Sequence, residues 1–437
     1  MRKLAKPKSL KEWLAYIEAL HPKSIEMGLE RVSIVANRLS LKPDFKVITV
    51  AGTNGKGSSC AMLSSIYTSA GYQVGCYTSP HLLRYNERVR INNQEVSDDV
   101  LCRAFEAVEE ARGEIELTYF EMGTLAAVWH FMQLKLDVVV LEVGLGGRLD
   151  AVNIFDADCA IVTNVDMDHM DYLGDTREKI GLEKAGVYRA SQISICGDDS
   201  PPESLISYAK RIGADLKLAG LDYHVKSDSL GWHYQDSNGE LYIPNLRLVG
   251  KFQVNNAASV IYAIRALTSC LPVSDHVFGD VLPNIELLGR FQYIHHQPDI
   301  IADVAHNPQA ALSLSENLKN LDLNKKTKLI AVFAMLADKD IASVISLIKN
   351  QIDVWYVASI HHPRAASAEL LKESLLQNEV SVPILTFPKV EDALISAYKK
   401  MAKNDKIIVF GSFFTVAAVL ECLPFEETTI DLVTESN

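Results

Sequence analysis

Short apolar runs, each followed by a helical pattern, recur along this chain of 437 residues and restrict the folds open to it. Residues 136–147, LDVVVLEVGLGG, are almost continuously apolar and stop at a glycine cluster. Such a run, unlike an alternating one, is typical of a strand buried on both faces of a parallel sheet. Similar runs occupy 46–51, 72–78, 159–165 and 193–196. We therefore predict an α/β fold whose βαβ units form a parallel sheet.

The segments between these runs carry helix signals. Ser9 precedes a stretch with apolar residues at helical spacing, and serine is a favoured N-cap. A further helix is expected over 57–70, ending at Gly71, because glycine commonly follows the last helical turn. Residues 222–246 are richer in polar and aromatic residues and predict a local β insertion.

A second series of strands begins near residue 290 and predicts a second α/β domain. Its candidate strands, each followed by a helical pattern, lie within 299–308, 328–336, 354–359 and 405–413. The chain is also too long for one ordinary core. We expect two domains, 1–288 and 289–437, with the boundary near Gly289.

Composition excludes several classes of protein. The net charge of −12 argues against nucleic acid as a partner, because phosphate backbones need a basic face. The seven cysteines are odd in number and show no C-x-x-C spacing, which favours a reducing compartment over a disulfide framework. The basic first residues run into no apolar segment, and no stretch is long and apolar enough to span a membrane. We expect a cytoplasmic protein without a signal peptide.

The stretch KVITVAGTNGKGSSCAML, 46–63, predicts a phosphate-binding loop in a shortened form. It departs from G-x-x-x-x-G-K-[ST], since Val50 stands at the first glycine and Gly57 where the Ser or Thr belongs. A strand, a glycine turn and a helix start still direct backbone N–H groups and a helix dipole at a phosphate. Lys56 would reach the β- and γ-phosphates, and Ser58 or Ser59 would approach magnesium. The alternative is a glycine-rich turn with an exposed lysine.

Acidic residues after two strands are candidate metal ligands. Glu142 ends a buried strand, where a charge is costly unless paired or bound to metal. The alternative is a surface carboxylate. Asp166, Asp168, His169 and Asp171 follow the strand near 160 and suit a metal or a water molecule. The alternative there is an acidic loop that caps a helix.

Other polar residues are weaker candidates. Lys184 lies in a helical stretch and, by itself, suggests a solvated lysine paired with a glutamate. Asp303 and His306 sit on one turn that suits ribose or phosphate contacts, or alternatively a capped turn at Asn307. Solvated loop positions are expected for the histidine pairs 295–296 and 361–362, and core or pocket-wall positions for the Met and aromatic residues of 119–132.

Taken in order, these pieces resemble one family closely: the bacterial dihydrofolate synthase/folylpolyglutamate synthases, relatives of the Mur peptide ligases. The resemblance runs almost end to end, and the shortened phosphate loop is the family's own form. The motifs that carry it occupy 25–32, 50–58, 77–91, 117–127, 141–153, 168–174, 183–189, 250–259, 288–292, 303–308 and 409–417.

This resemblance implies a fold and an activity. The fold is α/β, with a P-loop-containing, Mur-ligase-like central domain that binds ATP and pterin, and a smaller Rossmann-like glutamate-ligase domain at the C-terminus. The activity is ATP-dependent ligation: a substrate carboxylate becomes an acyl phosphate, and the amine of L-glutamate displaces the phosphate. Two Mg²⁺ ions would neutralise the crowded oxygens.

The resemblance also implies roles for individual residues. The catalytic residues would be Lys56, Lys184, His169 and His306. Magnesium ligands would be Ser79, Glu142, His169 and Lys184, the last as an N6-carboxylysine. ATP contacts would come from Thr53, Asn54, Gly55, Lys56, Gly57, Ser58, Asn256, Arg290 and Asp303. The pterin pocket would be formed by Glu26, Met27, Gly28, Leu29, Thr118, Tyr119, Phe120, Glu121, Leu149, Asp150 and Ala151.

The pterin segments indicate the bifunctional subtype, which adds the first glutamate to dihydropteroate and further glutamates to reduced folates. The alternatives are a monofunctional folylpolyglutamate synthase, a Mur-type peptide ligase, and a nucleotide-binding switch without ligation. The expected partners are small molecules, and family members are generally monomeric. The sequence departs from the family at Leu288, where relatives often have proline, and at Phe414, where they commonly have histidine.

Overall fold

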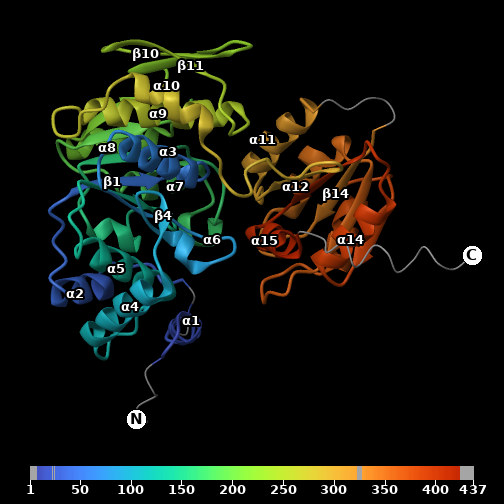
Figure 1. The fold of residues 1–437 in the computed structure, drawn as a ribbon, viewed down its shortest axis with the longest axis horizontal. Coiled ribbons are helices and arrows are strands. Elements are labelled where there is room, and N and C mark those ends of the chain that lie inside the picture. The colour runs from blue at the N-terminus through green and yellow to red at the C-terminus, as the bar shows by residue number, and fades with distance from the viewer. Residues whose placement is uncertain (1–6, 22, 24, 322–326, 424–437) are drawn as a thin grey trace, which may run out of the picture. The chain divides into compact units, whose positions relative to one another are not determined.

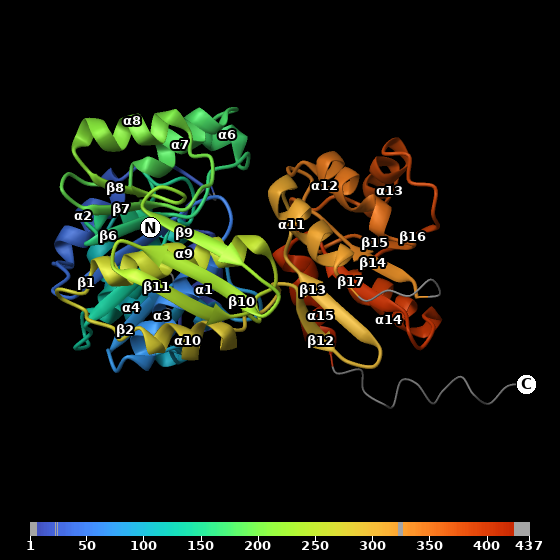
Figure 2. The same cartoon turned by 90° about the horizontal axis from the view of Figure 1, so that it is seen from above.

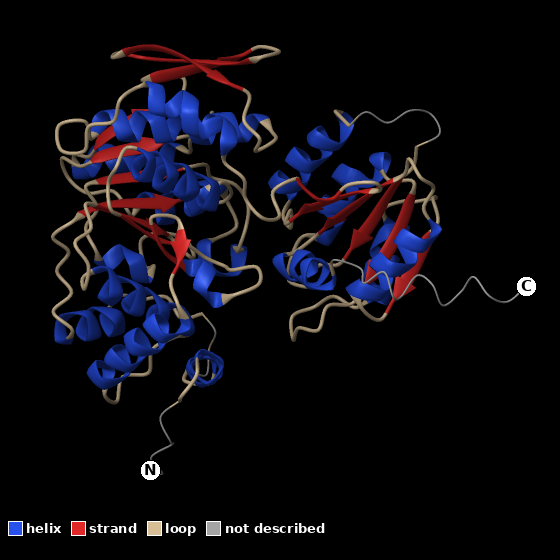
Figure 3. Ribbon diagram, viewed as in Figure 1, coloured by secondary structure: helices blue, strands red, loops and turns tan. Residues whose placement is uncertain are grey.

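The computed structural model describes residues 7–21, 23, 25–321 and 327–423. The chain splits into two compact units, one formed by Met1–Arg247 with Lys251–Glu286 and the other by Leu248–Gly250 with Leu287–Asn437. Figures 1, 2 and 3 show the two units as ribbons. The assignment of an ATP- and pterin-binding role to 1–288 and a glutamate-ligase role to 289–437 stays a prediction. Within the described part of the chain, no helix has the length and apolar character to cross a membrane.

The first unit is built on an eight-stranded sheet. From one edge to the other its strands are β4 (Gln94–Glu95), β3 (Val89–Ile91), β2 (Val74–Tyr77), β5 (Val138–Glu142), β1 (Lys46–Ala51), β6 (Cys159–Val162), β7 (Ile193–Cys196) and β8 (Asp215–Leu218). The six strands from β2 to β8 are parallel, whereas β3 and β4 pair antiparallel. The central strands β5 and β1 are buried along almost their whole length, as their unbroken apolar runs predict.

Helices cover both faces of this sheet. Those of the first unit are α1 (Leu10–Glu18), α2 (Glu30–Arg38), α3 (Lys56–Ser69), α4 (Asp98–Arg112), α5 (Tyr119–Phe131), α6 (Met170–Leu173), α7 (Arg177–Ala185), α8 (Glu203–Ile212), α9 (Lys251–Ala266) and α10 (His276–Val281), with short 3₁₀ segments at Tyr85–Arg88, Ala151–Ile154 and Leu282–Asn284. Helices α1, α2, α4, α5 and α8 share one apolar core with alternate residues of the strands. Helices α3 and α9 pack together on the opposite face (Figure 3).

Most elements that the sequence predicts in this unit are confirmed. Ser9 caps α1, since its hydroxyl accepts from Glu12 N at 3.3 Å. Helix α3 begins one residue earlier than expected, and Gly71 follows it with φ of +93°. The insertion at 222–246 is an antiparallel meander of β9 (Tyr223–Ser227), β10 (Gly231–Asp236) and β11 (Gly239–Pro244). Strand β6 is shorter than the predicted 159–165, because Thr163 and Asn164 bond to the end of β1 and to Thr53, while Val165 N donates to Asp198.

The second unit contains a six-stranded sheet with helices on both faces. Its strands run in the order β12 (Gln292–His295), β13 (Asp299–Asp303), β17 (Lys406–Phe410), β14 (Leu329–Phe333), β15 (Val354–Ala358) and β16 (Ile384–Phe387). Helices α11 (Pro308–Lys319), α12 (Ile341–Ile348) and α13 (Ala368–Gln377) share one apolar core, and α14 (Val390–Lys400) and α15 (Phe413–Cys422) the other; a 3₁₀ turn spans Lys349–Gln351. All strands but β12 are parallel, as expected for a Rossmann-like domain.

Candidate functional site

The predicted phosphate loop joins β1 to α3 and is bent by glycines that no other residue could replace without a clash. Gly55 is the N-cap of α3 with φ of +84°, and a Cβ there would lie 2.6 Å from the amide of Asn256. Gly52, with φ of +145°, would place a Cβ 1.8 Å from Thr163 Oγ1. These glycines let the backbone turn tightly ahead of a helix N-terminus, which is the geometry that phosphate requires. The structure also brings Asn256 of α9 to this loop, and its predicted contact with ATP stays a prediction.

Two polar side chains of the loop are arranged for a phosphate. Lys56 Nζ donates to the carbonyls of Gly52 and Thr53 at 3.1 Å each, so its ammonium lies over the loop itself. Ser58 is 1% exposed, and among the described residues its Oγ finds no hydrogen-bond partner. A buried orphan hydroxyl is costly unless a ligand satisfies it. The loop therefore fits a nucleotide phosphate with its metal ion.

The segment after β6 fixes the shape of the loop, and the sequence did not reveal this role. Asn164 accepts from the backbone N–H groups of Thr53 and Asn54 at 3.2 and 2.9 Å. Thr163 Oγ1 donates to the Asn54 carbonyl at 2.6 Å, and Thr53 Oγ1 exchanges hydrogen bonds with the backbone of Asp166. The sequence shows only that an apolar run ends in polar residues, and this does not reveal which segment those residues contact.

Glu142 and Ser79 meet beside the phosphate loop. Glu142 is 4% exposed at the end of β5, and Ser79 N donates to its Oε2 at 3.0 Å. A Cβ on Gly57 would lie 3.8 Å from the same carboxylate oxygen, so the alternative of a surface carboxylate is wrong. Among the described residues no three His, Cys, Asp or Glu side chains gather as a ready metal site. Mg²⁺ needs few carboxylates beside phosphate oxygens and water, so this sparse set fits it.

His169 and its neighbours form the loop between β6 and α6. His169 occupies the N-cap position with φ of +50°, and Asp168 Oδ1 accepts from its backbone N–H at 2.9 Å. A positive φ is uncommon for a residue with a side chain and marks a constrained position. The N-cap residue His169 makes no side-chain capping bond to α6, and the alternative of an acidic helix-capping loop stays a prediction.

The environment of Lys184 differs strongly from the one that its sequence neighbours suggest. It lies on α7 and is 3% exposed, so the expectation of a solvated lysine is wrong. A Cβ on Gly147 would lie 2.9 Å from its carbonyl oxygen, which shows how closely the loop after β5 covers it. Burial, and then the charge of Lys56, lower the pKa of Lys184 from 10.5 to about 7. The amine is therefore neutral in a large fraction of molecules near neutral pH.

The three predicted pterin segments converge in the first unit. Gly28 N donates to Leu149 O at 3.5 Å, which joins 26–29 to 149–151. Arg31 donates to Glu26 and to Glu121, which joins 26–29 to the start of α5. Arg31 was not among the predicted residues, although it lies within the 25–32 motif. Its ion pair with Glu121, 90 residues away, could not be read from the sequence.

Aromatic rings line the start of α5. Tyr119 packs edge-on against Tyr85, and Phe120 lies 5.9 Å from the ring of Tyr77. The guanidinium of Arg88 sits over Tyr119 at 5.5 Å. Further along the helix, Met122, Leu125 and Phe131 are buried in the core, as expected for 119–132.

Asp150 is a buried carboxyl group in the third pterin segment. Its oxygens accept from Leu145 N at 2.8 Å and from Val152 N at 3.1 Å. Burial raises the pKa of Asp150 to about 7, against the lowering effect of these hydrogen bonds. The group can therefore both accept and donate hydrogen bonds near neutral pH, which suits recognition of a polar ring.

Three predicted residues belong to the second unit. Asp303 ends β13 and accepts from Phe291 N at 2.9 Å and Ala305 N at 2.8 Å, and burial raises its pKa to about 6 while Arg290 opposes that rise. His306 Nδ1 lies 2.8 Å from Val304 O, and Arg290 lies over the ring of Phe413 at 5.3 Å. Asn307 caps α11, as its alternative reading predicts.

The paired histidines follow the sequence prediction only in part. His296 and His361 are exposed. His295 instead ends β12, a strand that the sequence did not predict, where it contacts the Pro298 carbonyl and packs edge-on against Tyr398. His362 is half-buried and lies 4.4 Å from the ring of Phe414, the position that departs from the family.

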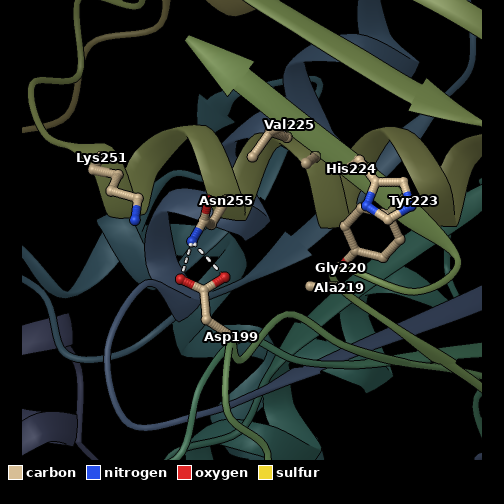
Figure 4. A pocket seen from close by; sticks show the side chains of 9 residues that line it. Asp199, Ala219, Gly220, Tyr223, His224, Val225, Lys251 and Asn255 are labelled. Carbon is tan, nitrogen blue, oxygen red and sulfur yellow. Dashed lines mark hydrogen bonds between the residues drawn. The ribbon is translucent and has the colours of Figure 1, made fainter.

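A pocket of about 300 Å³ opens beside the N-terminus of α9 (Figure 4). Asn255 donates to both carboxylate oxygens of Asp199 at 3.2 and 3.3 Å, while Lys251 and His224 lie at either side of this pair. None of the residues that line the pocket belongs to the predicted set.

The fold and the site together define a class of protein, the Mur ligases. The Mur ligase middle-domain model matches residues 50–264, which carry the phosphate loop, Glu142, His169 and Lys184. The model of the Mur ligase glutamate ligase domain matches residues 289–413, which carry Arg290, Asp303 and His306.

Within that class, comparison with individual proteins identifies the family. The chain is 46% identical to the dihydrofolate synthase/folylpolyglutamate synthase of Escherichia coli K12 over 95% of both sequences. The E. coli FolC protein solved with DHPP and ADP matches with a TM-score of 0.90 and 45% identity, over 96% of this chain and 98% of that one. A bifunctional synthase solved with Mn, AMPPNP and L-glutamate matches with a TM-score of 0.87 and 44% identity, over 97% and 100%. This chain belongs to the dihydrofolate synthase/folylpolyglutamate synthase family.

Proposed function

We propose that this protein is a bifunctional ATP-dependent ligase, which adds L-glutamate to 7,8-dihydropteroate to form dihydrofolate and adds further glutamates to reduced folates. The observation that carries the proposal is the convergence, in one unit, of a phosphate loop, a buried carboxylate beside it and the three pterin segments. The likeness to relatives that bind ADP, DHPP, AMPPNP, Mn and L-glutamate supports it.

The reaction proceeds in two steps. A carboxylate oxygen of dihydropteroate attacks the γ-phosphorus of ATP, the bond to ADP breaks, and an acyl phosphate forms. The glutamate nitrogen then attacks the acyl carbon, loses a proton, and expels phosphate to leave the amide. Activation is required because a carboxylate is a poor electrophile and its oxygen a poor leaving group.

The phosphate loop binds ATP in this proposal. The turn Thr53–Ser58 surrounds the phosphates with N–H groups, and the ammonium of Lys56 stabilises the charge that develops on the transferred phosphoryl group. Asn256 contacts the nucleotide from α9, and Arg290 and Asp303 are the further ATP contacts that the family resemblance implies.

Magnesium would be held by Ser79, Glu142, His169 and a modified Lys184. When bound, two such ions supply positive charge to the phosphate oxygens. A neutral Lys184 amine can attack the carbon of CO₂ and release a proton, which gives an N6-carboxylate. The lowered pKa and the burial of Lys184 favour this reaction, because an ammonium group has no lone pair to react. The product is an oxygen ligand of the type that Mg²⁺ prefers.

His306 is proposed as the proton acceptor for the attacking amine. If Nδ1 donates to the Val304 carbonyl, Nε2 is the basic nitrogen of the ring. His169 takes both a catalytic and a metal-binding role. We also infer that the enzyme works as a monomer in the cytoplasm, where its seven cysteines remain free thiols.

The proposal is tested by ADP release with ATP, Mg²⁺ and L-glutamate, with dihydropteroate and tetrahydrofolate compared as acceptors. Glutamate-dependent release with both is expected. Release with tetrahydrofolate alone would reduce the protein to a monofunctional synthase. Release that needs no glutamate would indicate a nucleotide switch, and activity on a UDP-sugar peptide would indicate a Mur-type ligase.

A further inference from the structure

We infer that Arg31 is a positioning residue for the pterin substrate, which holds the 26–29 segment against the start of α5 so that both segments present one binding surface. The inference rests on the proposed function, since it concerns the pocket that would receive dihydropteroate. Arg31 acts through the groups it holds and is not placed in contact with the substrate.

One guanidinium group joins the two segments. Arg31 Nη1 donates to Glu26 Oε1 at 3.1 Å, and Nη2 donates to the Glu26 carbonyl at 3.1 Å and to Glu121 Oε1 at 3.2 Å. Arg31 therefore holds both the main chain and the side chain of the loop residue, together with a residue 90 positions later. The planar fork of arginine allows this; a lysine ammonium would reach only part of the set.

Glu121 depends on this arrangement more than Glu26 does. Glu121 is 3% exposed, and its Oε2 accepts from Thr118 N at 2.8 Å while Thr118 Oγ1 accepts from Glu121 N. This capping box sets the first turn of α5, which carries Tyr119 and Phe120. Loss of Arg31 would leave a buried carboxylate without its cation, which disturbs that turn.

Glu26, in contrast, has other nitrogen partners nearby. His21 Nε2 and Lys23 Nζ lie 3.4 and 3.5 Å from its Oε2. The backbone bond from its segment to 149–151, from Gly28 N to Leu149 O, is long at 3.5 Å. The expected defect without Arg31 is thus a displaced 26–29 segment and a disturbed α5 start, rather than an unpaired charge at Glu26.

The test compares Arg31→Gln and Arg31→Lys with the wild type in steady-state kinetics and thermal unfolding. Arg31→Gln should raise KM for dihydropteroate roughly 10- to 100-fold, the effect of losing charged hydrogen bonds. Its kcat and its KM for ATP should stay within about twofold, because the phosphate loop is untouched. The KM of Arg31→Lys for dihydropteroate should lie between those of the wild type and Arg31→Gln, since one donor can still reach Glu121. Arg211→Gln, which removes an exposed arginine that lies over Tyr208 on α8, is the matched control and should change neither KM.

A folded Arg31→Gln with unchanged KM for dihydropteroate would overturn the inference. Parallel rises in both KM values with a lowered melting temperature would also overturn it, since they indicate a general structural role. If Arg31→Gln does not fold, Arg31→Lys decides the question by the same criteria.

Equilibrium binding separates this inference from the proposed function. If the wild type binds dihydropteroate but releases no ADP, the proposed function fails, and weaker binding by Arg31→Gln still supports the positioning role. Equal binding by the two proteins overturns that role. If the wild type does not bind dihydropteroate, both proposals fail.

Discussion

Lys56 and Lys184 both lie in the first unit, yet only Lys56 is marked as a functional residue by its neighbours in the sequence. Lys56 stands between a strand and a helix in a glycine turn, and its ammonium lies over that turn at 3.1 Å from two carbonyls. Lys184 stands in an ordinary helical stretch but is 3% exposed, and burial lowers its pKa to about 7.

The difference shows that the properties of a functional lysine can depend either on local backbone geometry or on packing between remote elements. A phosphate loop is made by local backbone geometry, so its lysine can be identified from neighbouring residues. A neutral lysine is made by the elements that bury it, here the loop after β5 packed on α7, and those contacts are remote in sequence. Charge on Lys184 is costly for the folded chain, and this cost supports the modified, metal-binding lysine that we propose.

The largest effect is expected for Lys56→Ala. Turnover should fall by roughly 1,000-fold or more, because the transferred phosphoryl group loses its preorganised cation. ADP release measures the loss, and circular dichroism and thermal unfolding check that the fold is intact. Near-wild-type turnover in the folded variant would remove Lys56 from the mechanism.

Lys184→Ala should reduce turnover by roughly 100-fold or more, since one proposed metal ligand is lost. Unlike Lys56→Ala, this variant should regain part of its activity when acetate is added, because the small carboxylate can replace the N6-carboxylate. Acetate added to the wild type and to Lys56→Ala provides the control. Equal responses of the two variants to acetate would erase the proposed distinction between the lysines.

The two glycines that flank Lys56 give a smaller, local test of the loop. Gly55→Ala forces a Cβ to within 2.6 Å of Asn256 at a φ of +84°, and should cost about 1–3 kcal/mol of unfolding free energy. Gly57→Ala adds a Cβ in ordinary contact with Glu142 inside α3, and should change stability by no more than about 1 kcal/mol. Urea unfolding measures the stability of both variants, and equal losses of unfolding free energy would contradict the loop geometry.

The smallest effect is the pH dependence that Lys184 gives to stability. Between pH 7 and 10.5 the unfolded chain binds a proton at this lysine that the folded chain does not, so wild-type stability should rise with pH relative to Lys184→Met. The slope is at most about 1.4 kcal/mol per pH unit. Urea unfolding at pH 7.5 and 8.5 in CO₂-depleted buffer measures it. If the unfolding free energies of the wild type and Lys184→Met change equally between the two pH values, Lys184 is not neutral in the folded protein.

The sequence predicts the central strands of both sheets, because they are buried and leave continuous apolar runs, and some helix starts, such as those capped by Ser9 and Asn307. It does not predict the strands β3, β4, β8, β12 and β16 toward the sheet edges, because they are short and partly exposed. It also identifies the glycine turn before α3 and, through the family resemblance, three segments that converge in the first unit, whose phosphate and pterin roles stay predictions. Arg31, Asn164 and the burial of Lys184 escape prediction, because each depends on a contact between residues far apart in the chain. The early end of β6 could not be predicted for the same reason.

The most direct test of the account follows the oxygen atoms of dihydropteroate whose carboxylate is labelled with ¹⁸O. The enzyme is supplied with ATP, Mg²⁺ and L-glutamate, and the released phosphate is analysed by mass spectrometry. An acyl phosphate predicts one ¹⁸O atom in phosphate for each dihydrofolate formed, with the other retained in the amide carbonyl. Phosphate without label would contradict carboxylate activation, and with it the ligase mechanism proposed for this site.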